Sequence, residues 1–256
     1  MKISIIIPVL NSHELLRRYL LYLEKIGIKE DEEIIIMDDG SDVPLTYSDG
    51  KLPVSIYQTH DKRPWTSSLA RNIAARQYAK GEYFIMVDLD HVITREIIDM
   101  AKTFGGQKIQ FEREFAVLTE NGEISQDPEV LFEYGYPRKR YEEMGCRKSP
   151  HQNMFVMRRD VFLEIGGYRE DLVERAYPQG EDRLFKKEWY KWERDGKGKV
   201  HDVRPVIYVI PSGYQCEGGD VDSDPKGLFH NLSRKTNRNF KYKDQKNRER
   251  EQRTSK

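Results

Sequence analysis

The sequence has few of the features that mark secreted, redox-active or membrane-spanning proteins. It contains only two cysteines, Cys146 and Cys216, and their separation excludes a metal-type or redox-type spacing. We expect both to be free thiols in a reducing compartment. No apolar run approaches the ~20 residues that a membrane helix needs, and no small-residue cleavage site follows the apolar residues near the N-terminus. These absences predict a soluble cytoplasmic protein and leave peripheral contact with a membrane open.

Excess charge and internal repeats are also missing, as are the motifs GxGxxG, Walker A and CxxC. Lys+Arg and Asp+Glu both number 43, so the overall charge indicates no polyanionic partner. The distribution is uneven, because residues 234–256 hold ten Lys/Arg against three Asp/Glu and almost no aliphatic side chain. Such a segment cannot bury enough apolar surface to fold alone. We predict a domain over 1–230 and a basic extension over 231–256, either solvated or in contact with a polyanion.

Apolar runs alternate with amphipathic segments through the first 105 residues. Runs at 2–10, 32–38, 54–60 and 82–90 are typical of strands, and the segments at 13–26 and 66–80 repeat apolar residues at helical spacing, with Gly27 and Gly81 as stops. This alternation predicts an α/β fold with a mainly parallel sheet. Ligands bind such sheets at the carboxyl ends of the strands. Polar residues at 8–11, 38–41 and 88–91 should therefore meet in one crevice.

The second half, 106–230, loses this alternation. Asn121-Gly122 predicts a hairpin turn, and residues 153–168 indicate a strand, a short helix and a glycine stop. Residues 178–196 predict an amphipathic helix that begins with Glu181 and Asp182, and 203–211 a last strand. Acidic residues in a first helical turn are stabilising by themselves.

The stretch FIMVDLDHVI, at 84–93, places two carboxylates at the end of an apolar run. In extended backbone Asp88 and Asp90 would point to the same side. Because adjacent carboxylates repel each other, they favour a divalent cation bound through oxygen. Such a cation could neutralise a departing diphosphate. A D-x-D pair is weak evidence alone, and its position after a buried strand strengthens it.

Five motifs occur in one order along the chain: IIIPVLN (5–11), MDDGS (37–41), SLARNIAARQYAKGEYFIMVDLDH (68–91), FVMRRDVFLEIGGYRED (155–171) and GEDRLFKKE (180–188). Together they resemble a family 2 glycosyltransferase of the GT-A fold, over positions 3 to about 192. The resemblance implies a nucleotide-sugar-binding half at 1–105 and an acceptor-binding half at 106–230. It implies transfer of a sugar from a nucleotide-diphospho-sugar, most often UDP-linked, to a glycan, lipid-linked or other hydroxyl acceptor.

The resemblance also implies which residues bind the donor. The base and ribose would lie against the first two strand ends, and Arg71 would face the diphosphate, for which a guanidinium is suited. Two other interpretations remain open: an acidic turn in which an aspartate caps a bend, and an arginine paired with a neighbouring acid. The implied donor-binding residues are Pro8, Val9, Asn11, Asp38, Asp39, Arg71, Asp88 and Leu89.

A metal site and a catalytic base follow from the same resemblance. Asp90 would bind Mn²⁺ or Mg²⁺ directly, Asp88 would contact the ribose or a metal-bound water, and His230 would be a third ligand. His91 replaces the acid that often follows D-x-D, and we expect it outside the first coordination sphere. Asp182 would be the general base of an inverting mechanism, with Glu181 in support.

Two other classes remain as alternatives. A sugar-phosphate nucleotidyltransferase also needs metal-binding carboxylates, but it would carry a glycine-rich basic loop after the first strand, and PVLNSHE has neither glycine nor lysine. A nucleic-acid-directed protein would use the basic extension, but the expected crevice is acidic. The segment 110–140 matches no motif of the family, and we expect it to determine the acceptor. Trp189 and Trp192 are expected in the core rather than on a sugar ring.

Overall fold

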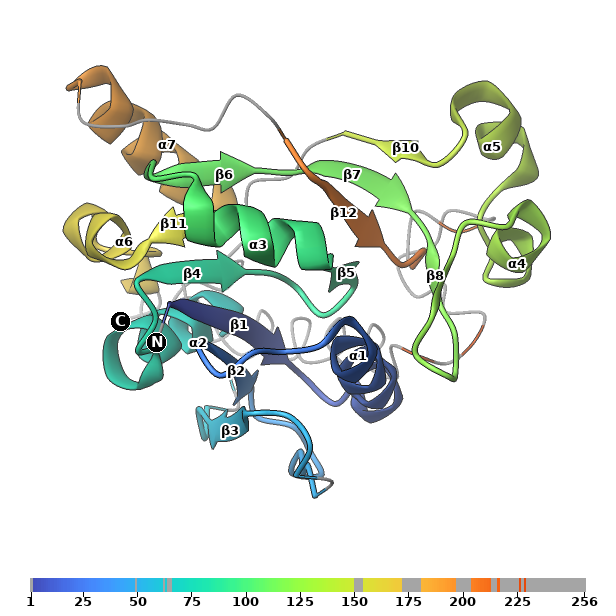
Figure 1. The fold of residues 1–256 in the computed structure, drawn as a ribbon, viewed down its shortest axis with the longest axis horizontal. Helices are drawn as coiled ribbons and strands as arrows, with labels where there is room; N and C mark the ends of the chain where they lie inside the picture. The colour runs from blue at the N-terminus through green and yellow to red at the C-terminus, as the bar shows by residue number, and fades with distance from the viewer. Residues whose placement is uncertain are drawn as a thin grey trace, which may run out of the picture.

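The computed structural model describes residues 2–48, 50–61, 63, 66–149, 154–171, 181–196, 204–212, 216, 226 and 228, which form a mixed α/β fold (Figure 1). The first half contains β1 Ile3–Val9, α1 His13–Ile26, β2 Glu32–Asp38, β3 Val54–Gln58, α2 Ser67–Ile73, the π-helix η1 Ala74–Tyr78, β4 Tyr83–Met86, β5 His91–Val92 and α3 Arg95–Thr103. The second half contains β6 Lys108–Gln110, β7 Glu112–Phe115, β8 Val117–Leu118, β9 Ile124–Ser125, α4 Pro128–Glu133, α5 Arg138–Met144, β10 Arg147–Lys148, β11 Phe155–Arg158, α6 Arg159–Ile165, α7 Glu181–Arg194 and β12 Val206–Val209.

The main sheet has six strands in the order β3-β2-β1-β4-β11-β6. β1 pairs in parallel with β2 and β4, and β2 pairs in parallel with β3. β11 is antiparallel to both of its neighbours, β4 and β6. The predicted α/β class and the mainly parallel sheet are confirmed.

Helices cover both faces of this sheet, which explains the continuous apolar runs. Successive side chains of a strand point to opposite faces, so Ile5 and Ile6 of β1 enter different cores. Ile5 packs with residues of α1 and α3, and Ile6 packs with residues of α2, α6 and α7. Trp189 of α7 is fully buried in the second core, as expected. A strand buried on both faces has no polar side to alternate with.

A smaller sheet, in the order β10-β7-β12-β5, extends from the carboxyl edge of the main sheet. The chain passes from β6 of the main sheet directly into β7 (Figure 1). β5 begins at His91, immediately after Asp90, and pairs with β12 through Val209. The second sheet therefore lies beside the D-x-D segment. β8 and β9 form the expected hairpin around Asn121-Gly122.

Several boundaries differ from the sequence predictions. The helix expected to end at Gly81 ends at Tyr78, after a π-helical turn in which Ala79 N donates to Ala74 O. Gly81 lies instead against β1, where an added Cβ would be only 2.5 Å from Ser4 N. The fourth strand ends at Met86, before the two aspartates. Gly27 ends α1 as expected.

Both cysteines are free thiols, and Cys216 is buried. None of the helices in the described part of the chain has the length and apolar character needed to cross a membrane.

Candidate active site

The carboxyl ends of β1 and β2 are joined by hydrogen bonds through Asn11. Asp39 N donates to Val9 O at 2.8 Å, which brings the two chain segments together. Asn11 N donates to Ser41 Oγ at 2.8 Å, and the Asn11 amide exchanges hydrogen bonds with Asp42 Oδ2 and N. Asn11 has φ 53°, a left-handed conformation that asparagine tolerates better than most residues. Hydrogen bonds thus connect the two strand ends.

The two aspartates of MDDGS have different surroundings. Asp38 accepts hydrogen bonds from Ser41 N at 2.8 Å and Leu45 N at 3.2 Å, so its carboxylate caps the turn. Asp39 is 3% exposed and accepts a hydrogen bond from the Thr66 hydroxyl. Thr66, which precedes α2, was not singled out from the sequence. Asp38 therefore caps the bend, which is the alternative interpretation given for the acidic turn. Asp39 is held by Thr66, the residue that precedes α2.

Three further residues of the implied donor set lie at these strand ends. Pro8 and Val9 belong to β1 and are buried, and Leu89 between the D-x-D aspartates is 7% exposed.

Asp88, Asp90 and His91 form a group in which one possible ligand atom from each lies within 4.8 Å of the others. The reason given from sequence for this proximity was wrong. β4 ends at Met86, and the two aspartates occupy a turn in which His91 N donates to Asp88 O at 2.9 Å. The turn, rather than the alternation of a strand, brings the carboxylates together. The side chains of Asp88 and Asp90 remain partly exposed, at 34% and 24%.

The ring of His91 has a partner at both nitrogens. Nδ1 is 2.7 Å from Asp90 Oδ1, and Nε2 is 3.2 Å from Arg113 Nη1. Because a guanidinium only donates, Nε2 must accept, and Nδ1 must carry the proton that it donates to Asp90. His91 is therefore positioned to orient Asp90, and its place outside the first coordination sphere stays a prediction.

The donor set of this group fits a hard divalent cation. Asp88 and Asp90 offer partly exposed carboxylate oxygens, which Mg²⁺ and Mn²⁺ prefer. A histidine that donates to a ligating carboxylate is an outer partner of the kind that orients metal ligands. His230, the third ligand implied by the resemblance, lies outside the described residues.

Arg71 of α2 is fully buried and donates a hydrogen bond to Asp88 Oδ1. Its Cζ lies 5.5 Å from the centre of the Tyr168 ring. Burial opposes the charged form, yet the Asp88 carboxylate and the neighbouring Tyr168 and Glu181 raise the pKa of Arg71 above its ordinary value. The guanidinium thus pairs with an acid, which was the alternative to direct diphosphate contact.

Asn72, the next residue, has a role that sequence reasoning missed. Its Oδ1 accepts from Tyr168 N at 2.9 Å, and its Nδ2 donates to Tyr168 O and Glu170 Oε1, both at 2.8 Å. Gly167, with φ +69°, approaches so closely that an added Cβ would be 2.4 Å from Asn72 Oδ1. The signal was present in the sequence, since Asn72 lies in the same motif as Arg71. Together Arg71 and Asn72 connect the D-x-D turn to the turn Gly166-Gly167-Tyr168.

The first turn of α7 lies close to this connection. Glu181 is 6% exposed and Asp182 is partly exposed, with Asp182 Oδ1 accepting from Arg183 N at 2.7 Å. Burial raises the pKa of Tyr168, and the charges of Glu181 and Asp182 raise it further. Phe185, one turn later, stacks on Tyr168 with the ring centres 4.6 Å apart. The charges of both candidate bases therefore act on Tyr168, and that of Glu181 also acts on Arg71.

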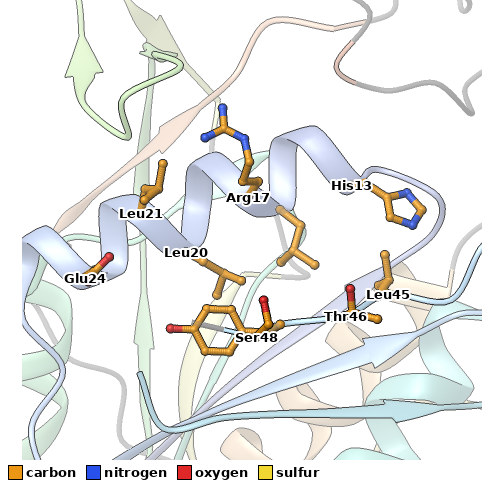
Figure 2. Close-up of a pocket in the computed structure, with 10 residues that line it drawn as sticks. His13, Arg17, Leu20, Leu21, Glu24, Leu45, Thr46 and Ser48 are labelled. Atoms are coloured by element: carbon orange, nitrogen blue, oxygen red, sulfur yellow. The ribbon is translucent and has the colours of Figure 1, made fainter. Parts of the chain in front are cut away.

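A cavity of about 380 Å³ lies between α1 and residues 45–48 (Figure 2). His13, Arg17 and Leu20 line its helical side, and Leu45 and Thr46 line the other. None of the described residues predicted to bind the donor or a metal lines it. The cavity nevertheless adjoins the strand ends, because Leu45 N donates to Asp38 Oδ2 and the His13 ring lies 3.2 Å from Asn11 O.

Comparison of the sequence with models of protein families decides the family. The family model described as "Glycosyl transferase family 2" matches residues 4–166, which contain the strand ends, Arg71 and the D-x-D turn. The chain belongs to glycosyl transferase family 2. A search of curated protein sequences gives no match.

Solved structures of the same fold include glycosyltransferases of the GT-A type. TarS 1–349 of S. aureus in complex with UDP-GlcNAc superposes with a TM-score of 0.54 at 19% identity, covering 82% of this chain and 58% of that one. GalNAc-T7 with UDP, GalNAc and Mn²⁺ gives 0.50 at 17% identity, covering 88% and 45%. In another crystal structure of TarS 1–349, the chain spans about 61% of the solved chain. These likenesses confirm the expected GT-A fold.

Proposed function

We propose that the protein transfers a sugar from a nucleotide-diphospho-sugar, UDP-linked in our preferred assignment, to a hydroxyl group of an acceptor. The observation that carries the proposal is the group Asp88, Asp90 and His91 at the carboxyl edge of the parallel sheet, in a chain of this family. Ligands of α/β sheets bind at this edge. TarS solved with UDP-GlcNAc and GalNAc-T7 solved with UDP and Mn²⁺ share the fold and support the choice of donor.

In this proposal Asp88 and Asp90 hold Mn²⁺ or Mg²⁺, and His91 keeps Asp90 oriented. When bound, the cation supplies positive charge for the diphosphate. Arg71 holds the Asp88 carboxylate in place through its hydrogen bond to Oδ1. The nucleoside lies on the surface formed by Asn11, Asp39 and the end of β1.

Asp182 is assigned as the general base, which makes the reaction inverting. It takes the proton of the acceptor hydroxyl while that oxygen attacks the anomeric carbon. Its partial exposure at the start of α7 leaves its carboxylate accessible. The more deeply buried Glu181 contributes negative charge next to Arg71.

Calorimetry with UDP in the presence and absence of Mn²⁺ tests the metal-dependent donor site. Asp90→Asn keeps the shape of the side chain but removes the charge, so we expect the Mn²⁺-dependent part of UDP binding to disappear. Asp195→Asn, which alters an exposed carboxylate after the end of α7, is the matched control. Undiminished Mn²⁺-dependent binding by Asp90→Asn would remove Asp90 from the site.

The donor itself is identified with a panel of nucleotide sugars. Slow hydrolysis of the donor in the absence of acceptor releases the nucleoside diphosphate, which is recorded for each sugar with Mn²⁺. We expect one UDP-sugar to be hydrolysed faster than the others. Hydrolysis of none of them, together with no nucleotide binding, would overturn the proposal.

A further inference from the structure

The side chains of Arg113, Arg140 and Lys148 form a cationic group, and the charge of Asp90 acts on Arg113 and Lys148. Arg113 lies on β7 and Lys148 on β10, and the two residues are direct partners in the antiparallel pair. Phe115 is two residues after Arg113, so its ring is on the same face of the small sheet. The Lys148 ammonium lies 4.7 Å and the Arg140 guanidinium 5.3 Å from the centre of that ring.

Arg113 connects this group to the candidate metal ligands. Its Nη1 lies 3.2 Å from His91 Nε2, and its Nε donates to Ser149 O at 2.6 Å. The side chain is only 6% exposed. Both of its partners are uncharged, so the positive charge of a nearly buried guanidinium is not neutralised by either contact.

No carboxylate within the described ranges forms an ion pair with Arg113, Arg140 or Lys148. Arg140 Nε is buried and has no hydrogen-bond partner among those same residues. Burial lowers the pKa of Lys148 to about 8, and the charges of Arg113 and Arg140 add to this while Asp90 opposes it. Burial lowers the pKa of Arg113 too, against the opposing charges of Asp90 and Asp88. Repulsion among three cations that form no direct ion pair is destabilising, and an anion between them would relieve it.

The position of the cations separates them from the expected donor site. Asp88 pairs with Arg71 from α2, in the half that contains β1 and β2. Asp90 instead faces His91 and, through it, Arg113. The cations come from the segment 112–148. This segment includes most of 110–140, which matches no motif of the family. The D-x-D turn is thus approached by a cation from each half of the chain, Arg71 at Asp88 and Arg113 at His91.

We propose that Arg113, Arg140 and Lys148 form an anion-binding subsite for a phosphate group of the acceptor. This inference rests on the proposed function, since it assigns the substrate class of the same site. Guanidinium groups suit bidentate contact with phosphate oxygens. The phosphate could instead be that of the donor, and the experiment separates the two sources.

The experiment measures binding of glycerol 3-phosphate to the whole chain, first alone and then with the donor site saturated by UDP and Mn²⁺. The test variant is the double substitution Arg140→Met and Lys148→Met, which keeps side-chain length and leaves Arg113 and His91 in place. Arg147→Met is the matched control, because it removes a charge from the neighbouring position of β10, on the opposite face. Thermal unfolding confirms that each variant folds.

We expect wild type to bind glycerol 3-phosphate, but not glycerol, with UDP and Mn²⁺ present. The double variant should lose at least about tenfold in this affinity while UDP affinity changes less than about twofold. Three results would overturn the inference: no phosphate binding by wild type, phosphate binding abolished by saturating UDP, or a double variant that loses UDP affinity instead. If wild type binds phosphate through these cations but binds no nucleotide, the anion-binding subsite is supported and only the proposed function is refuted.

Discussion

The buried guanidinium of Arg71 donates a hydrogen bond to the partly exposed carboxylate of Asp88. This pair connects α2 with the turn that carries the candidate metal ligands. The two partners differ in their access to water, since Arg71 is 0% and the Asp88 side chain 34% exposed. Their substitutions should therefore have unequal effects.

We predict that Asp88→Asn destabilises the fold more than Arg71→Met does. Asp88→Asn leaves a buried guanidinium without its carboxylate, which costs about 3–5 kcal/mol. Arg71→Met leaves a carboxylate that water can solvate, so about 1–3 kcal/mol is expected. Urea unfolding of both single variants and the double variant measures the difference and the coupling. Equal losses in the single variants, with no coupling in the double variant, would show that the pair contributes nothing specific.

His91 gives a prediction for metal affinity. His91→Phe removes the donor to Asp90, and loss of such an outer partner typically weakens metal binding by ~10–100-fold. His91→Asn should restore most of the affinity, because the amide nitrogen occupies the place of Nδ1 and can donate to Asp90. The readout is the Mn²⁺ concentration required for half-maximal UDP binding. If His91→Asn is as defective as His91→Phe while His91→Asp restores binding, the ring is itself a ligand.

Sequence reasoning located much of the strand-end site because buried parallel strands are continuous apolar runs. β1, β2 and β4 lie within such runs, and each run ends in the polar residues that meet at the sheet edge. The motifs then directed attention to Arg71 and to the D-x-D aspartates. The sequence could not decide the partner of Arg71. No local pattern distinguishes an arginine that contacts a diphosphate from one that pairs with an aspartate such as Asp88.

The second sheet could not be predicted in the same way. β5 and β10 have two residues each, too few for any period, and their partners are distant in sequence. His91 pairs with Val209, which in turn pairs with Phe115. The gathering of Arg113, Arg140 and Lys148 depends on these long-range pairings. The hairpin at Asn121-Gly122 was predictable because its turn chemistry is local.

The first turn of α7 provides a kinetic prediction. Asp182→Asn should lower kcat by ~10²–10⁴-fold, the usual contribution of a general base, with UDP affinity near that of wild type. Asparagine caps helices as well as aspartate does, so a merely structural Asp182 would lose almost no rate. Sugar transfer by Asp182→Asn and Glu181→Gln is measured side by side. A dead Glu181→Gln with an active Asp182→Asn would move the base by one residue, and two active variants would count against the inverting mechanism.

Lys108 of β6 gives a prediction for stability against pH. It is 1% exposed, and its ammonium lies 4.9 Å from the ring centre of Trp189 and 5.3 Å from that of Phe155. Burial lowers the pKa of Lys108 to about 7, with Glu193 opposing and Lys186 adding to the effect. Between this value and the ordinary lysine pKa near 10.5, the unfolded chain binds a proton that the folded chain does not. The contribution of Lys108 to the free energy of unfolding therefore rises with pH across this window and is constant below it.

Lys108→Met should remove that pH dependence and stabilise the protein at pH 7 by about 2–4 kcal/mol, since methionine fills the site without a charge to bury. The advantage over wild type should shrink as pH rises from 7 towards 10. Lys187→Met, at an exposed position of α7, is the control and should leave the profile unchanged. The measurement is urea unfolding at several pH values. If Lys108→Met is less stable than wild type at pH 7, the aromatic rings stabilise the ammonium more than burial penalises it, and Lys108 is charged in the folded protein.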